Sequence, residues 1–363
     1  MSKNSVYGVI LAGGRGERFW PLSTAERPKQ FLRLISDKMM LEETIDRVLP
    51  IVPKENIRIV TSATMSDLII QSIKGMKEPN ILGEPMGRNT CLAIGLAAVH
   101  LQKSDPDAVM VVLSADHLIR PAERLCKIIN IGVEISASED KLVTLGIVPT
   151  RPETAYGYIK LGDVYKKIDS TSIYDSAAFT EKPKAAVAHE YYFSGGYMWN
   201  SGMFIWSATS IMKAIEVCQP AMFGLLKEYS GKIGSKGEEK ARKELYEKAI
   251  SISIDVAVLE NAKNVLTIKA DIVWDDIGSW NALDRYKEHD SDNNVIIGPT
   301  LTANSYEITV YNDTDGLVGC LGVSDLVIVR TDEVTLVVHK TQTGNIKNLL
   351  SLVEQNEIYR KFL

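Results

Sequence analysis

The residues best suited to chemistry lie in a glycine-rich stretch near the start of the chain, residues 11–22 (LAGGRGERFWPL). Glycines lack a Cβ, so their backbone amides can approach a phosphate group closely, and the arginines beside them add positive charge. Lys29 follows Arg27-Pro28, so that residues 15–33 contain five cations and two anions. This local excess of positive charge predicts a site for a small polyanion.

Two common phosphate-binding motifs do not fit this stretch. The dinucleotide fingerprint GxGxxG would begin at Gly14 and Gly16, but Phe19 stands where the third glycine belongs. The P-loop pattern GxxxxGK[ST] has no match in the chain. Taken alone, residues 13–16 (GGRG) are also compatible with an ordinary glycine turn flanked by solvated arginines. The longer run from residue 11 through residues 28–30 (PKQ) favours a phosphate-binding loop.

Asp116 is a candidate metal ligand, because it ends the apolar run 111–115 (VVLSA). Ligands bind at the carboxyl ends of parallel strands, and Mg²⁺ takes one or two carboxylates together with substrate oxygens. A structural role for Asp116, capping the segment that follows, is the alternative.

A further carboxylate, Glu84, lies in residues 83–90 (GEPMGRNT), which open a predicted helix. A carboxylate can accept hydrogen bonds from N1–H and N2–H₂ of guanine, a pattern that adenine does not offer. Asn89 or Thr90 would serve as the helix N-cap, which is a sufficient structural reason for either residue.

Strand-like and helix-like segments alternate along the first part of the chain and must position these residues. Alternation of this kind predicts βαβ units and a parallel sheet. Expected strands are residues 6–11, 57–60, 108–113 and 142–147, and expected helices are residues 41–49, 65–73, 89–101 and 122–136. After residue 149 we expect strands at 157–161, 177–180 and 203–206 and a helix at 238–249.

A polar break at residues 290–294 (DSDNN) precedes a different pattern. Short β-rich runs follow it at residues 295–297, 307–311, 325–329 and 334–338, and then a helix-like tail at 344–354. We therefore expect two domains, residues 1–290 and a small β-rich domain at 291–363.

Composition limits the classes of partner. The formal net charge of −5 argues against a broad nucleic-acid surface, and no apolar run is long enough to span a membrane. The first five residues lack a signal-peptide pattern, so we expect a cytoplasmic protein. The four cysteines form no CxxC pair, which favours buried free thiols over a zinc site.

Together these motifs resemble the sugar-phosphate nucleotidyltransferases, and in particular the mannose-1-phosphate guanylyltransferases. The resemblance is carried by residues 11–31, 83–90, 114–117 (SADH), 150–158 (TRPETAYGY), 179–183 (FTEKP), 199–204 (WNSGMF) and 274–280. Ala155 stands where the family has glycine, and Ser114 stands where proline or alanine is also expected. Residues 251–260 (SISIDVAVLE) also resemble the family, but Asp255 receives no firm role.

The resemblance implies a Rossmann-like, three-layer α/β domain with a mixed, mostly parallel sheet, followed by a C-terminal β-helix-like domain. It implies Mg²⁺-assisted transfer of GMP from GTP to mannose 1-phosphate, which gives GDP-mannose and pyrophosphate. Such C-terminal modules often pair subunits, so a homodimer is expected by analogy.

The resemblance also assigns roles to individual residues. The nucleotide loop is formed by Leu11, Ala12, Gly13, Gly14, Arg15 and Gly16. Glu84 and Asn89 contact the base. The metal ligands are Asp116 and Asp276. The sugar phosphate is bound by Gly157, Glu181, Lys182 and Asn200. The catalytic set is Arg18, Lys29, Asp116, Lys182 and Asp276.

Three other interpretations compete with this one. A different base or sugar would use the same fold, and selectivity between such substrates is often only a few kcal/mol. A non-catalytic regulatory subunit would be expected to lack some of the catalytic ions, all of which are present. A second, phosphomannose isomerase domain does not fit the short segment after residue 290, where no histidines cluster.

Overall fold

A computed structural model of the chain describes residues 5–363, so the first residues of the signal-peptide prediction, 1–4, lie outside the described part. The chain forms two compact units. The first contains the chain up to Gly13, Thr44–Ala115 and Ile119–Trp274. The second contains Gly14–Glu43, Asp116–Leu118 and Asp275–Leu363. Each unit is therefore assembled from segments that are separated in sequence.

The first unit is built on a nine-stranded mixed sheet. Its strands, in spatial order, are β3 (Ile81–Glu84), β2 (Ile57–Ser62), β1 (Val6–Leu11), β4 (Val109–Ser114), β9 (Tyr197–Ser207), β6 (Leu142–Ile147), β10 (Val265–Ala270), β8 (Thr171–Thr180) and β7 (Tyr158–Ile168). Strands β3, β2, β1 and β4 run parallel, with Ile10 of β1 opposite Ile59 and Leu113. Strand β9 runs antiparallel to both β4 and β6. The carboxyl ends of the parallel strands therefore lie along one edge of the sheet.

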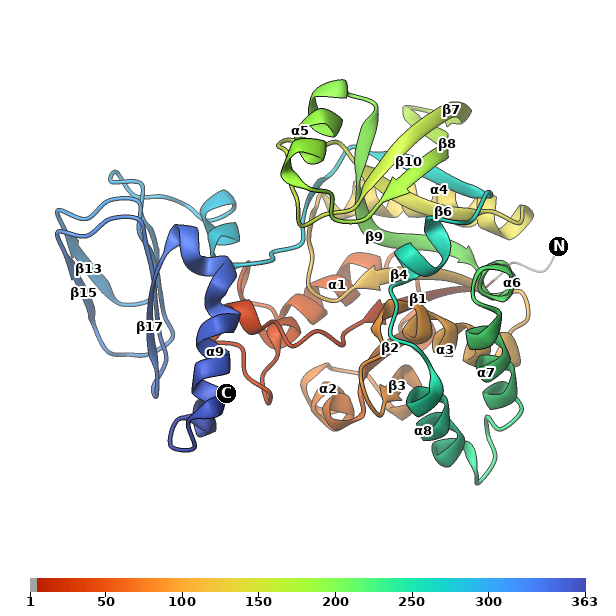
Figure 1. Cartoon of the computed structure of the whole chain (residues 1–363), viewed down its shortest axis with the longest axis horizontal. Coiled ribbons are helices and arrows are strands. Elements are labelled where there is room, and N and C mark those ends of the chain that lie inside the picture. The colour runs from red at the N-terminus through yellow and green to blue at the C-terminus, as the bar shows by residue number, and fades with distance from the viewer. Residues whose placement is uncertain (1–4) are drawn as a thin grey trace. The chain divides into compact units, whose positions relative to one another are not determined.

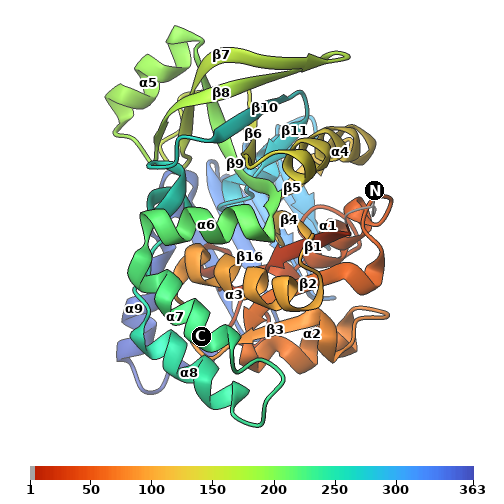
Figure 2. The ribbon, with the colours of Figure 1, turned by 90° about the vertical axis from the view of Figure 1, so that its right-hand side faces the viewer.

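Helices cover both faces of this sheet. One layer, visible in front of the sheet in Figure 2, contains α3 (Asn89–Ser104), α6 (Ala208–Cys218), α7 (Pro220–Ser230) and α8 (Glu238–Lys248). Phe204 and Trp206 of β9 are buried in the core that includes α3, whereas the intervening Ile205 contacts α4 (Ala122–Ser138) on the other face. A Cβ at Gly132 of α4 would lie 2.4 Å from Ile205 Cδ1, so the close approach of α4 requires this glycine.

The remaining elements of the first part of the chain are short. They are the helices α1 (Met40–Val48), α2 (Ser66–Ser72) and α5 (Ala185–Ser194), the paired strands β5 (Leu118–Arg120) and β11 (Val273–Asp275), the 3₁₀ turns Lys54–Asn56, Ala63–Met65 and Glu78–Asn80, and a π-helical turn, Asp255–Leu259.

Stacked parallel strands form much of the second unit, drawn in blue in Figure 1. One sheet contains β12 (Val295–Ile297), β14 (Thr309–Asn312), β16 (Leu326–Arg330) and β17 (Thr335–His339), of which the first three run parallel. Strands β13 (Thr300–Ala303) and β15 (Val318–Leu321) form a second parallel pair. Parallel strands that recur in two small sheets within so short a segment are typical of a β-helix.

A separate hydrophobic core stabilises the second unit and includes its N-terminal segment. Phe19 and Trp280 are fully buried with ring centroids 5.1 Å apart, and both pack with Tyr311 of β14 in this core. The other elements are the 3₁₀ turns Glu17–Phe19, Lys29–Phe31, Trp280–Arg285, Lys340–Asn345 and Arg360–Phe362, and the helix α9 (Ile346–Gln355).

The predicted fold class, an α/β domain with a mixed sheet and a C-terminal β-rich region, is confirmed. Most predicted elements lie within a few residues of the observed ones. The helices and strands that were not predicted are β3, β5, α5, α6, α7, β10, β11, β13 and β15. All four cysteines are free, although Cys218 is only half-buried. Within residues 5–363, no helix combines the length and the apolar character needed to cross a membrane.

Candidate functional site

A cavity of about 460 Å³ in the second unit brings several predicted residues together. Its walls include the predicted Arg15, Gly16, Arg18, Lys29, Asp116 and Asp276. They also include Glu17, His117 and Lys347, which the sequence analysis does not assign to the site. The cavity thus contains four basic side chains from Arg and Lys and three carboxylates, a composition suited to an anion accompanied by a metal cation.

Lys29 is the central cation of this cavity. Its ammonium group donates to Asp116 Oδ2 at 2.8 Å and to the backbone oxygen of Asp276 at 2.7 Å. Only 7% of the Lys29 side chain is exposed, compared with 32% for Asp116. Although burial acts to raise it, the pKa of Asp116 is held below its ordinary value by Lys29 and His117. Asp116 is therefore an ionised carboxylate near neutral pH.

Gly16 determines how closely the glycine-rich loop approaches Lys29. Its φ is +68°, in the left-handed region that glycine adopts without strain. A Cβ added at Gly16 would lie 2.3 Å from Lys29 Cβ and 3.1 Å from Lys29 N. A side chain here would thus collide with the backbone that holds the central cation.

We expect Gly16→Ala to lower the free energy of unfolding by about 2 kcal/mol or more, because it adds backbone strain to a steric collision. Urea denaturation measures this difference. Gly14→Ala is the matched control, because no atom lies within 4 Å of a Cβ there and its φ is not in the left-handed region. Equal unfolding midpoints for the two variants would contradict the steric role of Gly16.

The adjacent residues Asp275 and Asp276 have different surroundings. Asp275 is 1% exposed and accepts hydrogen bonds from Arg285 through both oxygens, from Tyr286 Oη at 3.0 Å and from Ile277 N at 2.8 Å. Asp276, in contrast, lines the cavity. Asp275 is thus engaged in holding the local structure, whereas Asp276 lies at the wall of the cavity that a ligand would enter.

Backbone strain occurs beside three of the predicted motifs. Ile277, Lys182 and Asn89 have φ angles of 44°, 45° and 63°, although none is glycine. A β-branched residue such as Ile277 is rare in this region, and strained residues often cluster at functional sites. Ile277 lies between Asp276 and Gly278, both of which line the cavity.

The chemistry of the donor set fits Mg²⁺. Asp116 and Asp276 supply hard oxygen ligands to one cavity. Within the described residues, no group of three or more His, Cys, Asp or Glu side chains is arranged to hold a metal. Mg²⁺ does not need such a cage, because it keeps several waters and binds substrate phosphates together with one or two carboxylates.

A second group of predicted residues lies in the first unit around Glu84, at the end of β3. Glu84 is buried, and its Oε1 accepts a hydrogen bond from Tyr246 Oη at 3.0 Å. Burial raises the pKa of Glu84 to about 7, and the bond from Tyr246 offsets only part of this effect. The other oxygen, Oε2, lies 3.4 Å from the position that a Cβ on Gly13 would take. One carboxylate oxygen therefore faces the glycine-rich loop while the other is held by α8.

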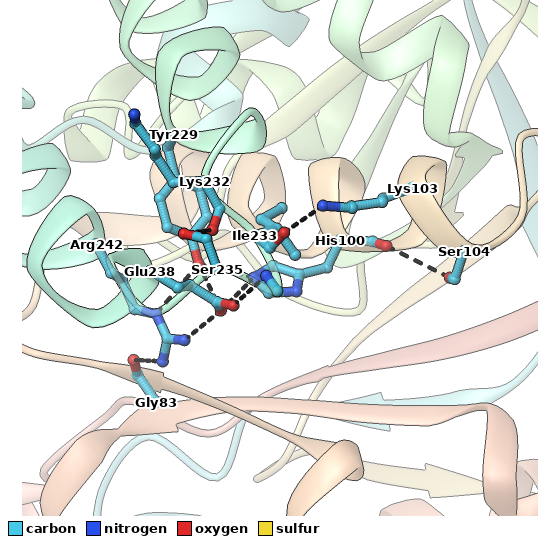
Figure 3. A network of polar contacts seen from close by, with 11 residues as sticks. Gly83, His100, Lys103, Ser104, Tyr229, Lys232, Ile233, Ser235, Glu238 and Arg242 are labelled. Atoms are coloured by element: carbon cyan, nitrogen blue, oxygen red, sulfur yellow. Dashed lines mark hydrogen bonds and ion pairs between the residues drawn. The ribbon is translucent and has the colours of Figure 1, made fainter.

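Helix α8 also contacts the residue before Glu84. Figure 3 shows Arg242 between Glu238 and Gly83, with Nη2 2.7 Å from Glu238 Oε1 and Nη1 donating to Gly83 O at 3.3 Å. Glu238 accepts in turn from Gly234 N at 2.6 Å. Since Arg242 and Tyr246 lie one helical turn apart, α8 fixes two successive residues at the end of β3.

This network forms part of the wall of a larger cavity, about 840 Å³, in the first unit. The cations Arg58, Lys103 and Arg242 are matched there by Asp67, Glu78 and Glu238. Burial lowers the pKa of His100 to about 4, so its ring is neutral near pH 7. The walls carry no net charge at that pH, and the structure gives no reason to expect an anion in this cavity.

The predicted sugar-phosphate residues form a third group, also in the first unit. A Cβ at Gly157 would lie 2.6 Å from Glu181 Oε2, so the Glu181 carboxylate approaches the Gly157 backbone closely. Asn200 donates through its backbone to Gly157 O and through Nδ2 to Asp255 Oδ1, both at 2.8 Å. Lys182 Nζ lies 2.7 Å from Glu181 Oε1. Carboxylates, an amide and an ammonium group therefore lie together, as a polyhydroxyl ligand with a phosphate requires.

The other predicted residues belong to the turns around these groups. Ala12 donates through its backbone to Val60 O at 2.8 Å and accepts from Thr61 Oγ1 at 3.0 Å, which fixes the loop after Leu11. Asn89 begins α3, and its Oδ1 accepts from Thr90 N. Thr90 Oγ1 accepts from Ile254 N rather than from its own helix. The N-cap of α3 is Arg88, so the prediction that Asn89 or Thr90 caps this helix is wrong.

Sequence reasoning leaves Asp255, Lys347 and Tyr246 without a role. Burial, followed by the charge of Glu181, raises the pKa of Asp255 to about 6, and its carboxylate is the partner of Asn200. The signal for Asp255 is present in residues 251–260, which resemble a family motif. Lys347 and Tyr246 lie in unremarkable helical sequence, so no local pattern identifies them.

The comparisons with known proteins identify the family of this chain. The family described as "Nucleotidyl transferase" matches residues 7–293, and that described as "MannoseP isomerase/GMP-like beta-helix domain" matches residues 300–353. A mannose-1-phosphate guanylyltransferase of Salmonella muenchen is 36% identical over 353 residues, which are 96% of this chain and 73% of that protein. One from Escherichia coli is 34% identical over 361 residues, covering 96% of this chain and 74% of the relative.

A solved structure is also similar over nearly the whole length. The crystal structure described as that of a "mannose-1-phosphate geranyltransferase" from Thermus thermophilus has a TM-score of 0.85 and 32% identity. The similarity covers 96% of this chain and 99% of that one.

Proposed function

Because this chain belongs to the nucleotidyl transferase family, and within it to the mannose-1-phosphate guanylyltransferases, we propose that it transfers GMP from GTP to α-D-mannose 1-phosphate. The products are GDP-mannose and pyrophosphate. The observation that supports this proposal most strongly is the cavity in which Lys29, Asp116 and Asp276 lie together with Arg15 and Arg18.

The proposed reaction is attack by a phosphate oxygen of the sugar phosphate on the α-phosphorus of GTP. The nucleophile is already an anion at pH 7, because the second pKa of a phosphate monoester is near 6. No general base or covalent intermediate is needed. The barrier arises from bringing two anions together and from charge on the transferring group, so catalysis depends on positioning and on cations.

The residues have separate tasks in this proposal. Arg15, Arg18 and Lys29 neutralise the triphosphate, while Lys182 holds the phosphate of the sugar. Asp116 and Asp276 would hold Mg²⁺, which neutralises phosphate charge when it is bound.

Two carboxylates, Glu84 and Glu181, would contact the base and the sugar of the substrates. The Glu84 carboxylate, which Tyr246 holds in place, accepts from the two donors of guanine beside the loop at Gly13. Glu181 accepts hydrogen bonds from the hydroxyl groups of mannose, and Asn200 donates to them. Asp255 orients the Asn200 amide by accepting from its Nδ2. A homodimer and a cytoplasmic location remain predictions.

A substrate panel tests the proposal. We expect Mg²⁺-dependent pyrophosphate release from purified protein mainly with GTP and mannose 1-phosphate, among the five common nucleoside triphosphates and several sugar 1-phosphates. Release with another pair would keep the reaction and overturn the substrates. Folded protein that releases no pyrophosphate with any pair would contradict the proposed activity and favour a non-catalytic binding subunit.

A further inference from the structure

Lys347 belongs to the C-terminal β-helix-like region, yet its side chain lines the cavity of Arg15, Arg18 and Lys29. The proposed reaction so far gives this region no part in substrate binding. The surroundings of Lys347 decide whether the region can supply a cation to the phosphate site.

The position of Lys347 is fixed by its neighbour. Ile346, the first residue of α9, is buried in the same hydrophobic core as Phe19 and Trp280. Since Phe19 directly follows the cavity residues Glu17 and Arg18, this core fixes the first turn of α9 beside the cavity wall. No side chain caps the amides of this turn, whose dipole adds to the positive potential near Lys347.

The ion pairs of Lys29 and Lys347 differ in how easily a phosphate group could replace the carboxylate partner. Lys29 is nearly buried and bonded to Asp116, so its charge is largely committed. Lys347 instead pairs with Glu17, with Nζ 2.9 Å from Oε2, and these two side chains are 57% and 36% exposed. An exposed ion pair contributes at most about 1 kcal/mol, whereas ammonium bonds to phosphate are charge-assisted and strong. Exchange of Glu17 for a phosphate group would therefore cost Lys347 little.

We propose that Lys347 binds the phosphate groups of GTP and of the pyrophosphate product, so that the C-terminal region completes the polyphosphate site. This inference rests on the proposed function, because it names a further residue of the same site. It also gives the C-terminal region a role in binding that does not depend on pairing of subunits.

The test is Lys347→Met, which keeps the length and apolar stem of the side chain but removes its charge. We expect the KM for GTP to rise about tenfold and inhibition by pyrophosphate to weaken about tenfold, with the KM for mannose 1-phosphate unchanged. Lys347→Arg should restore most of the affinity for GTP. An unchanged KM for GTP in folded Lys347→Met protein would overturn the proposal.

Two further variants separate binding from indirect effects. Lys340→Met removes another partly buried lysine of the same region, whose Nζ lies 2.7 Å from Asp284 Oδ2 and which does not line the cavity. It should change thermal stability but not the KM for GTP. Glu17→Gln tests whether Lys347 merely neutralises Glu17. Recovery of the wild-type KM in the Glu17→Gln, Lys347→Met double variant would overturn direct phosphate binding.

Calorimetry with pyrophosphate separates the role of Lys347 from the proposed reaction, because it measures binding without turnover. If the wild-type chain binds pyrophosphate and Lys347→Met binds it about tenfold more weakly, the inference stands even if the substrate panel identifies another sugar. If the panel succeeds while both proteins bind pyrophosphate equally, only the inference about Lys347 fails.

Discussion

Asp276→Asn is expected to lower kcat/KM for GTP and mannose 1-phosphate by roughly 10²- to 10³-fold, with a smaller shift of the unfolding midpoint than the same change at Asp275. The substitution keeps the size of the side chain but removes a charge that faces the cavity. Initial rates of pyrophosphate release at saturating Mg²⁺, with a urea unfolding curve for the same preparation, measure both quantities.

Asp275→Asn is the control, because the same change is made one residue earlier in the chain. Asp275 is almost fully buried and bonded to Arg285, Tyr286 and the Ile277 amide. Removing one partner of a buried ion pair costs about 3–5 kcal/mol, so this variant should unfold at a markedly lower urea concentration. A catalytic loss confined to Asp275→Asn, with Asp276→Asn fully active, would show that the roles of these residues are reversed.

Glu84→Gln is expected to stabilise the protein at pH 8 by about 3 kcal/mol while it reduces the preference for GTP over ATP. Burial raises the pKa of Glu84 from 4.5 to about 7, so the folded state binds more protons than the unfolded state between these values. Stability therefore falls as pH rises from about 4.5 to 7 and is lowest above pH 7. The Gln amide has no charge to desolvate and can still accept from Tyr246, but it presents an N–H where guanine needs an acceptor.

The measurement is urea unfolding of both proteins at pH 5 and pH 8, together with kcat/KM for GTP and ATP. Among the groups around Glu84, the Tyr246 hydroxyl stays protonated, because burial and the charge of Glu84 raise its pKa, and Arg242 stays charged. Glu238→Gln is a control in which the expected change in stability at pH 8 has the opposite sign. Although burial opposes it, the bonds from Gly234 and Arg242 lower the pKa of Glu238, so this variant should be less stable at pH 8. A pH-independent difference for Glu84→Gln would contradict the role of burial.

The sequence predicts the parts of the fold and site in which local pattern and local structure coincide. The glycine loop, the strand ending before Asp116 and the helix after Asn89 each follow from short-range signals. Helices α6 and α7 give no such signal, because their buried residues are set by packing against α3. Strand β10 is equally hard to predict from local sequence, because its burial depends on its neighbours β6 and β8, which are distant in sequence.

The site shows the same division. Resemblance predicts that Asp276 rather than Asp275 contacts the ligand, and only the structure shows that Arg285 and Tyr286 occupy the carboxylate of Asp275. Tyr246 donates to Glu84, and Lys347 lines the cavity that contains Arg15 and Lys29. Because these residues are far apart in sequence, no spacing of residue types predicts either contact. The elevated pKa of Glu84 likewise depends on burial, which a single motif does not reveal.

The cavity around Lys29 is assembled from four stretches of chain that leave the ribosome at very different times, namely residues 15–29, 116–117, 276–278 and Lys347. Lys29 emerges early, yet its two acceptors, Asp116 Oδ2 and the Asp276 carbonyl, lie 87 and 247 residues further on. Domains fold during synthesis as their segments appear, and contacts this remote form last. A nascent chain therefore carries its glycine loop without the acceptor that Asp276 provides for Lys29 until about three quarters of the sequence has been translated, and without Lys347 until later still. Truncated products that end before Asp276 would lack both its carboxylate and the carbonyl that holds Lys29.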